Sequence, residues 1–589
     1  MLRRALIAGI FVLVLAGSAA AQPRTAQRQL LMPGVVYEQQ VEFTNHGPVV
    51  IHVITAPRPG GLYDLKPVLS NGTILGTETV TSMQRGVSPT ATVAGVNGDL
   101  FTFASGRPTG GLMRDGVLDH APWSGRSTVG IDAQGLLHVD RVQFLSTWQG
   151  LGPRRAGVAL NAPPGPNGIT LFTPAWGPAT PASSGDVEVI LQPLPPTAPN
   201  AEVSGPVVAV AQNGNVPIPP DGAVLAARGT AAARLAAEAP IGQAVIFRLL
   251  LRPDWTGIVQ ALGGGPLLVR DGKTVFRAFE QFTTDQLLPR HPRTAVGQRA
   301  DGRIILLAVD GRQAGYSVGM TNFELAQALV RLGAVTGSAL DAGGSTTMAF
   351  DGRLLNSPSD PAGERSIAES LLVFYRGVYA PPPTVSVLSP NGDGVGEQQA
   401  LAYKVVRPST VTATLIGPDK VPHYSESGLR DPGTYPIPWS GRTTSGALEP
   451  QGRWQWVVQA VDDLGVTSSI NRGFTLNNTL GFLKGDRRAL AVPRMKPRSI
   501  ATATLAEPAT ILGWVETATG APVDNVATGR VGAGPLVLRW DGRNRAGRAV
   551  YPGRYVLRLA ANNAFGRVEL STQFRVAKAR FKVVSPKRS

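Results

Sequence analysis

The feature that most constrains the fold of this chain is a stretch in its C-terminal third that occurs twice without a gap. Residues Ile437–Gly465 align with Leu538–Gly566, and the alignment places Trp439 opposite Trp540. In each copy, apolar and polar residues alternate along short segments, and turns rich in Gly and Pro separate these segments. This pattern is typical of the strands of a β-sandwich. The duplication therefore predicts two related sandwiches.

Both copies resemble the immunoglobulin-like domain of the flagellar hook-capping protein. The resemblance implies two immunoglobulin-like β-sandwiches, at residues 384–476 and 477–577. Three consecutive prolines, at positions 381–383, precede the first copy. A proline run is stiff and unable to continue a sheet, so we interpret residues 377–383 as a linker.

A weaker repeat lies upstream of this linker. Leu112–Gly116 (LMRDG) matches Leu268–Gly272 (LVRDG), and Arg126–Val142 matches Arg293–Val309. Each segment predicts a β-hairpin, because its apolar residues flank a turn that contains glycine. We therefore expect residues 31–376 to form a pseudo-duplicated, β-rich domain of the α+β class, with a cleft where its halves meet.

Composition supports this fold class and narrows the partners. The 589 residues are 43% hydrophobic and include 69 Gly and 49 Pro, which favours folded, turn-rich β domains. Gly and Pro are dense between residues 177 and 221, which we interpret as a separator between the two halves. The net charge is +16, but the arginines are dispersed and form no basic helix, so no nucleic-acid partner is predicted. A solvated surface, an anionic envelope polymer or a phosphate-bearing substrate fits this charge.

Residues 1–21 have the pattern of a secretory signal, with Arg3 and Arg4, an apolar run and a small-residue end at Ala19–Ala21. The apolar run is shorter than the roughly 20 residues that span a bilayer, so no membrane span is expected after cleavage. The chain has no cysteine, which excludes disulfides and cysteine-ligated metals. We therefore expect an exported protein, periplasmic or extracellular, most naturally bacterial, and the sequence leaves its oligomeric state open.

One helix is well marked, and it leads into an unusual polar stretch. Thr321 and Glu324 have the spacing of a capping box, and Gly333 is the expected stop. A short apolar strand follows and ends at Asp341, which is succeeded by Gly343, Gly344 and three hydroxyl residues beginning with Ser345. This stretch is either a tight turn or a cradle in which the backbone approaches a ligand.

Other polar segments are further candidates for the cleft. The segment GVNGDLF contains Asn97 and Asp99, and it predicts either a hairpin turn or part of a functional site. The segment GGGPLL occupies the matching place in the second half. The tripeptide D-G-R occurs four times and by itself marks a turn, which leaves Asp310 and Arg312 as open candidates. The loop NSPSDPAGERS adds Asn356, Glu364 and Arg365.

Taken in order, GVNGDLF, GGGPLL, PRTAVG, VDGR, LDAGGS and GER resemble the phosphodiester glycosidase family, over about residues 91–374. The resemblance implies hydrolysis of a sugar-1-phosphodiester to a free sugar and a phosphomonoester. Within it, the candidate catalytic carboxylates are Asp341, Asp99 and Glu364. The candidate substrate-binding residues are Asn97, Arg293, Asp310, Arg312, Gly343, Gly344, Ser345, Asn356 and Arg365. Ala342 and Leu100 depart from the family, which usually has Gly and an aromatic residue there.

This chemistry is consistent with the side chains present. A phosphate ester is already a good leaving group, so a strong proton donor matters less than in ordinary glycoside hydrolysis. Arginine binds phosphate oxygens in a bidentate manner, and Arg293 and Arg365 are the expected clamps, with Arg312 as a third candidate. No cofactor is predicted. No metal-binding residues are predicted, and the sequence leaves open whether a metal ion is bound. The Asp-containing loop Ser389–Glu397 is too short for an EF-hand and favours a turn.

Two alternatives come from other functional classes. A non-catalytic surface protein that binds envelope glycan in the same cleft would tolerate loss of a carboxylate but not of the arginines. A structural protein whose sandwiches scaffold the cell surface would leave the ordered polar motifs unexplained.

Overall fold

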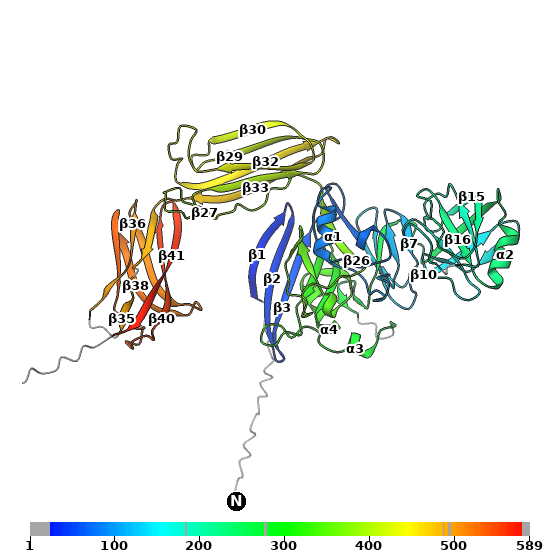
Figure 1. Ribbon diagram of the computed structural model, residues 1–589, viewed down its shortest axis with the longest axis horizontal. Helices are drawn as coiled ribbons and strands as arrows, with labels where there is room; N and C mark the ends of the chain where they lie inside the picture. Colours follow the sequence, from blue (N-terminus) through cyan, green and yellow to red (C-terminus); the bar gives the residue numbers. More distant parts are fainter. Residues whose placement is uncertain (1–23, 183–184, 276–279, 487, 493–495, 580–589) are drawn as a thin grey trace, which may run out of the picture. The chain divides into compact units, whose positions relative to one another are not determined.

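The computed structural model describes residues 24–182, 185–275, 280–486, 488–492 and 496–579, and the predicted signal at 1–21 lies outside them. The chain divides into two compact units, Met1–Tyr375 and Arg376–Ser589, both built mainly of strands (Figure 1). The predicted β-rich fold class is confirmed. No helix within the described ranges is long and apolar enough to cross a membrane.

The first unit contains two sheets with the same arrangement, in which a central strand lies between two hairpins. One sheet has the order β7-β6-β18-β8-β9, and the other contains β20-β19-β23-β21-β22, extended beyond β22 by β3, β2 and β1. The strands of the first are β6 (Leu112–Arg114), β7 (Val117–His120), β8 (Thr128–Asp132), β9 (Leu137–Asp140) and β18 (Ile258–Gly263). Those of the second are β1 (Arg24–Met32), β2 (Val35–Thr44), β3 (Gly47–Ala56), β19 (Leu267–Arg270), β20 (Lys273–Thr274), β21 (Arg293–Arg299), β22 (Ile304–Val309) and β23 (Ala334–Ala339). The hairpins expected from the upstream repeat are thus present in both halves.

The turns explain why the repeated sequence folds in this way twice. Asp115 and Gly116 have φ values of 50° and 80°, and their counterparts Asp271 and Gly272 have 53° and 72°. Asp and Gly tolerate this left-handed conformation, which a two-residue hairpin turn requires.

The predicted helix is α4 (Asn322–Arg331), and its capping box is confirmed, because Thr321 accepts from the Glu324 N–H and Glu324 accepts from the Thr321 N–H. Leu325 and Leu329 are buried, whereas Phe323 is exposed. The chain turns at Gly333 and enters β23, which delivers it to Asp341. Two shorter helices of this unit are α1 (Val80–Val87) and α3 (Thr284–Leu287).

A third sheet, of order β25-β24-β5-β26-β4, carries the polar motif that begins at Asn97. Every residue is buried in two of its inner strands, β5 (Thr92–Asn97) and β26 (Glu369–Tyr375). Asn97 ends one of them and pairs with Ser370 near the start of the other. The strands are β4 (Tyr63–Leu69), β5 (Thr92–Asn97), β24 (Met348–Phe350), β25 (Arg353–Leu354) and β26 (Glu369–Tyr375).

The segment between β9 and β18 folds into an eight-stranded sheet, and its apolar core also includes Met113, Leu118, Ile258 and Ala261 of β6, β7 and β18. The Gly- and Pro-rich residues 177–221, which we interpreted as a separator, supply two of its strands. In the longer of the two, Glu202–Ala211, buried and exposed residues alternate over the first half of the strand. The elements are β10 (Gln143–Gln149), β11 (Arg155–Ala156), β12 (Val158–Leu160), β13 (Ile169–Phe172), β14 (Val187–Leu191), β15 (Glu202–Ala211), β16 (Ala223–Ala227), α2 (Thr230–Glu238) and β17 (Ala244–Arg252).

The second unit contains two similar pairs of sheets, one for each copy of the downstream repeat. The matched tryptophans occupy equivalent places, with Trp439 4.6 Å from Trp454 and Trp540 5.9 Å from Tyr555, between ring centroids. The first pair comprises β27 (Val387–Leu388), β28 (Gln399–Val405), β29 (Ser409–Ile416), β30 (Pro422–Arg430), β31 (Gly433–Trp439), β32 (Gly452–Asp462) and β33 (Thr467–Leu476). The second comprises β34 (Leu480–Gly485), β35 (Leu490–Val492), β36 (Arg498–Leu505), β37 (Ala509–Thr517), β38 (Pro522–Val531), β39 (Gly534–Trp540), β40 (Gly553–Asn563) and β41 (Gly566–Lys578).

Candidate functional site

Asp341 lines a pocket of about 220 Å³ in the first unit. The pocket lies just beyond the end of β23, and its walls carry the basic side chains of Arg293, Arg312, Arg365 and His291. Three phenylalanines, at positions 101, 103 and 282, complete the apolar part of the wall. A carboxylate therefore shares one small cavity with several cations.

The tripeptide Asn97-Gly98-Asp99 holds Asp341 in place. The Asn97 side-chain amide donates to the Asp341 carbonyl at 2.8 Å, and the Asp341 N–H donates to the Gly98 carbonyl at 3.0 Å. The side-chain oxygen of Asn97, Oδ1, accepts from the Thr294 hydroxyl at 2.7 Å and from the Thr347 N–H at 3.1 Å. Asn97 is fully buried, so it ties together segments from three parts of the chain instead of touching a ligand.

Asp99 lies behind the pocket wall in a space made by glycines. A Cβ on Gly263 would lie 1.9 Å from Asp99 Oδ2, and one on Gly110 would lie 2.4 Å from the same oxygen. The side chain is 3% exposed. The glycines of GGGPLL thus allow close approach of a carboxylate, and the site forms where β18 and β23, the central strands of the two related sheets, come to an end.

Both aspartates have raised pKa values. Loss of hydration raises the pKa of Asp341 to about 6, although the Ala342 N–H and the charges of Arg365 and Arg126 oppose the shift. Burial raises the pKa of Asp99 to about 7, with Arg126 opposing and Asp341 adding to the shift. Two carboxyl groups with raised pKa values at one pocket are typical of functional sites.

A third carboxyl group belongs to this cluster and was missed in the sequence. Glu369 begins β26, is 1% exposed, and accepts from the Asp99 N–H at 2.9 Å. Its pKa is raised well above the usual value by burial and then by the charge of Asp99. In the sequence it simply precedes an apolar run, which gives no sign of a polar contact.

Two successive glycines let two guanidinium groups approach the segment after Asp341. A Cβ on Gly343 would lie 3.2 Å from Arg312 Nη1, and one on Gly344 would lie 2.1 Å from Arg365 Nη2. Gly343 also has a φ of 69°, which favours glycine. Both arginines line the pocket, so it presents two positive charges next to the Asp341 carboxylate.

These two arginines are oriented by neighbouring side chains. Arg312 donates to His291 Nδ1 at 3.2 Å, so His291 presents its Nε2–H to the Asp285 carbonyl at 3.2 Å. Arg365 binds Asp360 at 2.7 Å. Its guanidinium also lies 5.5 Å from the centre of the Phe103 ring, and Phe103 is 75% exposed.

Arg293 has a different position from the phosphate clamp that we expected. It is 3% exposed, and its three nitrogens donate to the carbonyls of Met320, Gln286 and Pro289 at 2.7–3.0 Å. Burial, followed by the charge of Arg312, lowers its pKa to about 10. Arg293 thus fixes the loop between α3 and β21 and contributes charge to the wall behind Arg312.

Three other candidates lie outside the pocket among the described residues. Glu364 accepts from both the N–H and the hydroxyl of Thr81 at the start of α1, at 2.9 and 2.6 Å. Asp310 is fully buried and binds His52 at 2.9 Å and Asn356 at 3.0 Å. Asn356 in turn accepts from the Met348 N–H, so this pair braces the segment that follows Asp341.

The predicted backbone cradle is also different from its expected form. The Gly343 N–H donates to the Pro292 carbonyl at 3.0 Å and so faces the protein. Gly344 and Ser345 are buried and are not among the described residues that line the pocket. The glycines thus provide space for arginine side chains.

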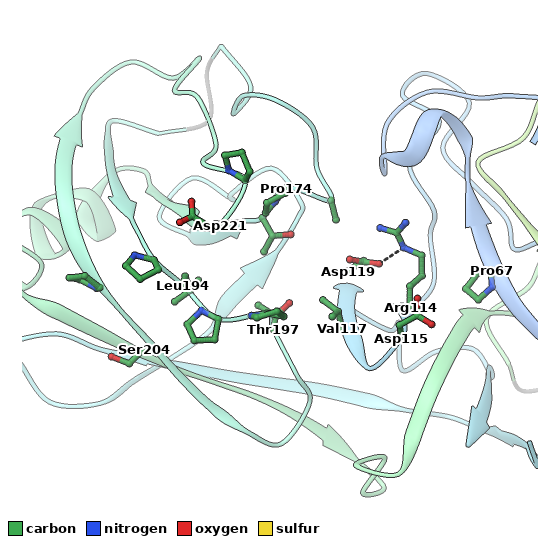
Figure 2. Close-up of a pocket in the computed structure, with 18 of the residues that line it drawn as sticks. Pro67, Arg114, Asp115, Val117, Asp119, Pro174, Leu194, Thr197, Ser204 and Asp221 are labelled. Atoms are coloured by element: carbon green, nitrogen blue, oxygen red, sulfur yellow. Dashed lines mark hydrogen bonds and ion pairs between the residues drawn. The ribbon is translucent and has the colours of Figure 1, made fainter. Parts of the chain in front are cut away.

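A larger cleft, of about 920 Å³, lies elsewhere in the first unit and shares no lining residue with this pocket. Figure 2 shows a proline-rich wall that includes Pro174 and Leu194 facing the hairpin that carries Arg114 and Asp119. The charged side chains are bound to one another or to neighbours: Arg114 to Asp119 at 2.6 Å, Lys66 to Asp115 at 3.5 Å, and Asp221 to Gln192 at 2.8 Å. The smaller pocket therefore has the stronger chemical features.

Within the described ranges, no group of three His, Cys, Asp or Glu side chains is placed to hold a metal ion. The loop Ser389–Glu397 forms a turn in which Asp393 accepts from the N–H groups of Val395 and Phe482, both at 2.9 Å.

Part of the first unit is similar to a known protein family. Residues 197–374 match the phosphodiester glycosidase family, a range that includes Asp341, Arg312 and Arg365 but not Asp99. Over 111 residues the chain is 35% identical to an uncharacterised SPbeta prophage-derived protein, YomE, of Bacillus subtilis, which is 19% of this chain and 17% of that protein.

Solved structures that are similar to this chain include two that each cover more than half of it. One is a hypothetical protein from Synechocystis, 26% identical, with a TM-score of 0.49, covering 58% of this chain and 62% of its own. The other is the zebrafish N-acetylglucosamine-1-phosphodiester alpha-N-acetylglucosaminidase catalytic domain, 17% identical, with a TM-score of 0.33, covering 61% of this chain and 89% of its own.

Proposed function

We propose that this chain is an exported hydrolase that cleaves a sugar-1-phosphodiester of an envelope or extracellular glycan to a free sugar and a phosphomonoester. The observation that carries the proposal is the pocket in which Asp341 lies beside Arg312 and Arg365. The family match over residues 197–374 supports a hydrolase that acts on phosphodiester-linked sugars.

Each part of the pocket has a role in this reaction. Arg312 and Arg365 bind the phosphate oxygens and stabilise the charge that the leaving phosphomonoester gains. Asp341, once ionised, stabilises the positive charge that develops on the sugar ring or attacks its anomeric carbon. The pocket is smaller than the roughly 300–1,000 Å³ of typical ligand sites, which favours a single sugar unit inside and the remaining glycan outside.

The test is a substrate comparison with three classes of compound: sugar-1-phosphodiesters, neutral glycosides with an aryl leaving group, and phosphodiesters without a sugar. We expect release of free sugar and phosphomonoester from the first class alone. Turnover of the sugar-free phosphodiesters would instead indicate a phosphodiesterase, and tight binding of the first class without turnover would favour the glycan-binding alternative.

A matched pair of arginine variants tests the phosphate contact. Arg312→Ala removes a cation that lines the pocket, whereas Arg303→Ala removes one from an exposed turn, where it lies 3.7 Å from Asp301. We expect Arg312→Ala to weaken binding of a sugar phosphodiester by about tenfold or more, since hydrogen bonds to charged groups contribute about 1.5–3 kcal/mol. Arg303→Ala should bind normally.

A further inference from the structure

Glu369 has an environment that neither the motifs nor the proposed reaction explains. It lies at the first position of a strand whose residues are all buried, and one carboxylate oxygen, Oε1, accepts from the Asp99 N–H. The other oxygen, Oε2, is buried with no hydrogen-bond partner among the described residues, and Asp99 Oδ1 is in the same situation. A buried anionic oxygen without a donor is strongly unfavourable.

The backbone around Glu369 is shaped to hold this carboxyl group. The Gly98 N–H donates to the Glu369 carbonyl at 2.8 Å. A Cβ on Gly98 would lie 2.8 Å from Glu369 Cγ, so a larger residue there would displace the side chain. Glu369 therefore contacts the N-G-D tripeptide through both its backbone and its side chain, and that tripeptide in turn holds Asp341.

The charged groups around Glu369 favour the neutral form of its carboxyl group. Asp99 and Asp341 add negative charge on the pocket side, and the cations Arg126 and Arg365 lower the pKa of Asp341. On the other sides, β4 presents Leu69 opposite Glu369, and one cation of β4 and one of α1 are bound to other groups. Lys66 of β4 binds Asp115, and Arg85 of α1 donates to the Gly352 carbonyl.

We propose that Glu369 is a positioning residue of this site: a neutral carboxylic acid that holds the N-G-D tripeptide, and through it Asp341, in the geometry that the reaction needs. Glu369 and Asp99 each have a buried carboxyl oxygen without a hydrogen-bond donor in the described part of the chain, and a proton on Glu369 removes one of these two charges and supplies a donor to the cluster. Glu369 has no contact with the pocket, so it acts through Asp99 and the backbone of Gly98. The proposal rests on the proposed function only for its effect on activity.

The protonation state is tested without substrate, by infrared difference spectroscopy of the full chain at pH 8. At that pH Asp341 and Asp99 are mainly ionised, because their pKa values are about 6 and about 7. We expect the wild-type protein to retain the carbonyl band of a protonated carboxylic acid, and Glu369→Gln to lose it. Glu364→Gln is the matched control, because it removes a glutamate five residues away that binds Thr81, and it should retain the band. A wild-type spectrum without this band, or a band that persists in Glu369→Gln, would overturn the proposal.

The positioning role is tested by comparing two substitutions with a sugar-phosphodiester substrate. Glutamine keeps an acceptor for the Asp99 N–H and resembles the neutral acid, so Glu369→Gln should retain kcat within about threefold. Glu369→Ala removes the acceptor and leaves a cavity, so it should lower kcat by about tenfold or more with KM little changed. Equal losses in both variants would show that the negative charge is needed and would contradict the proposal. If no variant and no wild-type sample turns the substrate over, the proposed function fails, while the infrared result still decides the state of Glu369.

Discussion

At the scale of single residues, Asp341 is the most direct test of the proposed reaction. Asp341→Asn keeps the size of the side chain and removes its charge. The interaction strengthens only as positive charge develops on the sugar, so kcat should fall by orders of magnitude while substrate binding changes little. Steady-state kinetics and direct binding measurements separate the two effects. Asp301→Asn, in an exposed D-G-R turn, is the control, and near-normal turnover in Asp341→Asn would exclude a catalytic role for this carboxylate.

The raised pKa of Asp341 predicts the pH dependence of the reaction. In the proposed reaction the ionised form of Asp341 is the active one, and its pKa is about 6. As the pH falls through about 6 the carboxylate takes up a proton, so kcat/KM should decrease toward acidic pH. An ordinary aspartate, with a pKa of 3.8, would place this decrease at lower pH. A pH–rate profile between pH 4.5 and pH 8, with folding checked at each point, measures this limb. An acidic limb near pH 4 would mean that another group controls the rate.

Residue types and their order were enough to select several residues that share one pocket, but not to say which of them reach the cavity. Asp341, Arg312 and Arg365 line one pocket, and Asn97 and Asp99 lie directly behind it. Which of these reach the cavity depends on the packing of backbone from distant segments. Arg293 is an example, because the carbonyls that bind it come from α3, the following loop and the segment before α4.

At the scale of elements, the end of β18 is a sharp test of how the two halves build the site. Gly263→Ala places a Cβ 1.9 Å from Asp99 Oδ2, so the carboxylate or the strand must move. Overpacking of this kind typically costs about 1–3 kcal/mol of folding free energy, and displacement of Asp99 should also reduce kcat. Gly257→Ala, just before the other end of the same strand, meets no atom within 4 Å and is the control. Thermal unfolding and kinetics of both variants measure the effects, and indistinguishable variants would contradict this account of the site.

Elements were predictable where local signals were complete. The hairpins and α4 carry their own turn and capping residues, so their sequences specify them without help from the rest of the chain. The eight-stranded sheet between β9 and β18 was missed because its prolines and glycines lie among its strands. Pro206, for example, lies inside β15, where pairing with β17 and β14 overrides the local preference.

At the scale of the whole molecule, all residues of the candidate site belong to the unit that ends at Tyr375. Each unit has apolar clusters of its own, such as those around Leu329 in the first and Trp540 in the second. The second unit therefore contributes no described side chain to the pocket. Within the second unit, Trp439 packs against Phe474 and Trp540 packs against Phe574. The two copies of the downstream repeat therefore pack their tryptophans in the same way, as the repeated sequence predicted.

The separate cores lead to a prediction about cleavage of the chain. Limited proteolysis should cut near the prolines at 381–383 and leave a stable fragment that contains the first unit, because few stabilising contacts are expected to cross a domain boundary. Since the pocket is complete within that fragment, its kcat/KM for a small sugar phosphodiester should stay within about twofold of the uncut chain. Fragment masses and kinetics of the separated fragment provide the measurement, with the uncut protein as the control. A fragment that folds but loses activity on the small substrate would mean that the second unit takes part in the reaction. A loss seen only with polymeric glycan would instead assign the second unit to holding the larger substrate.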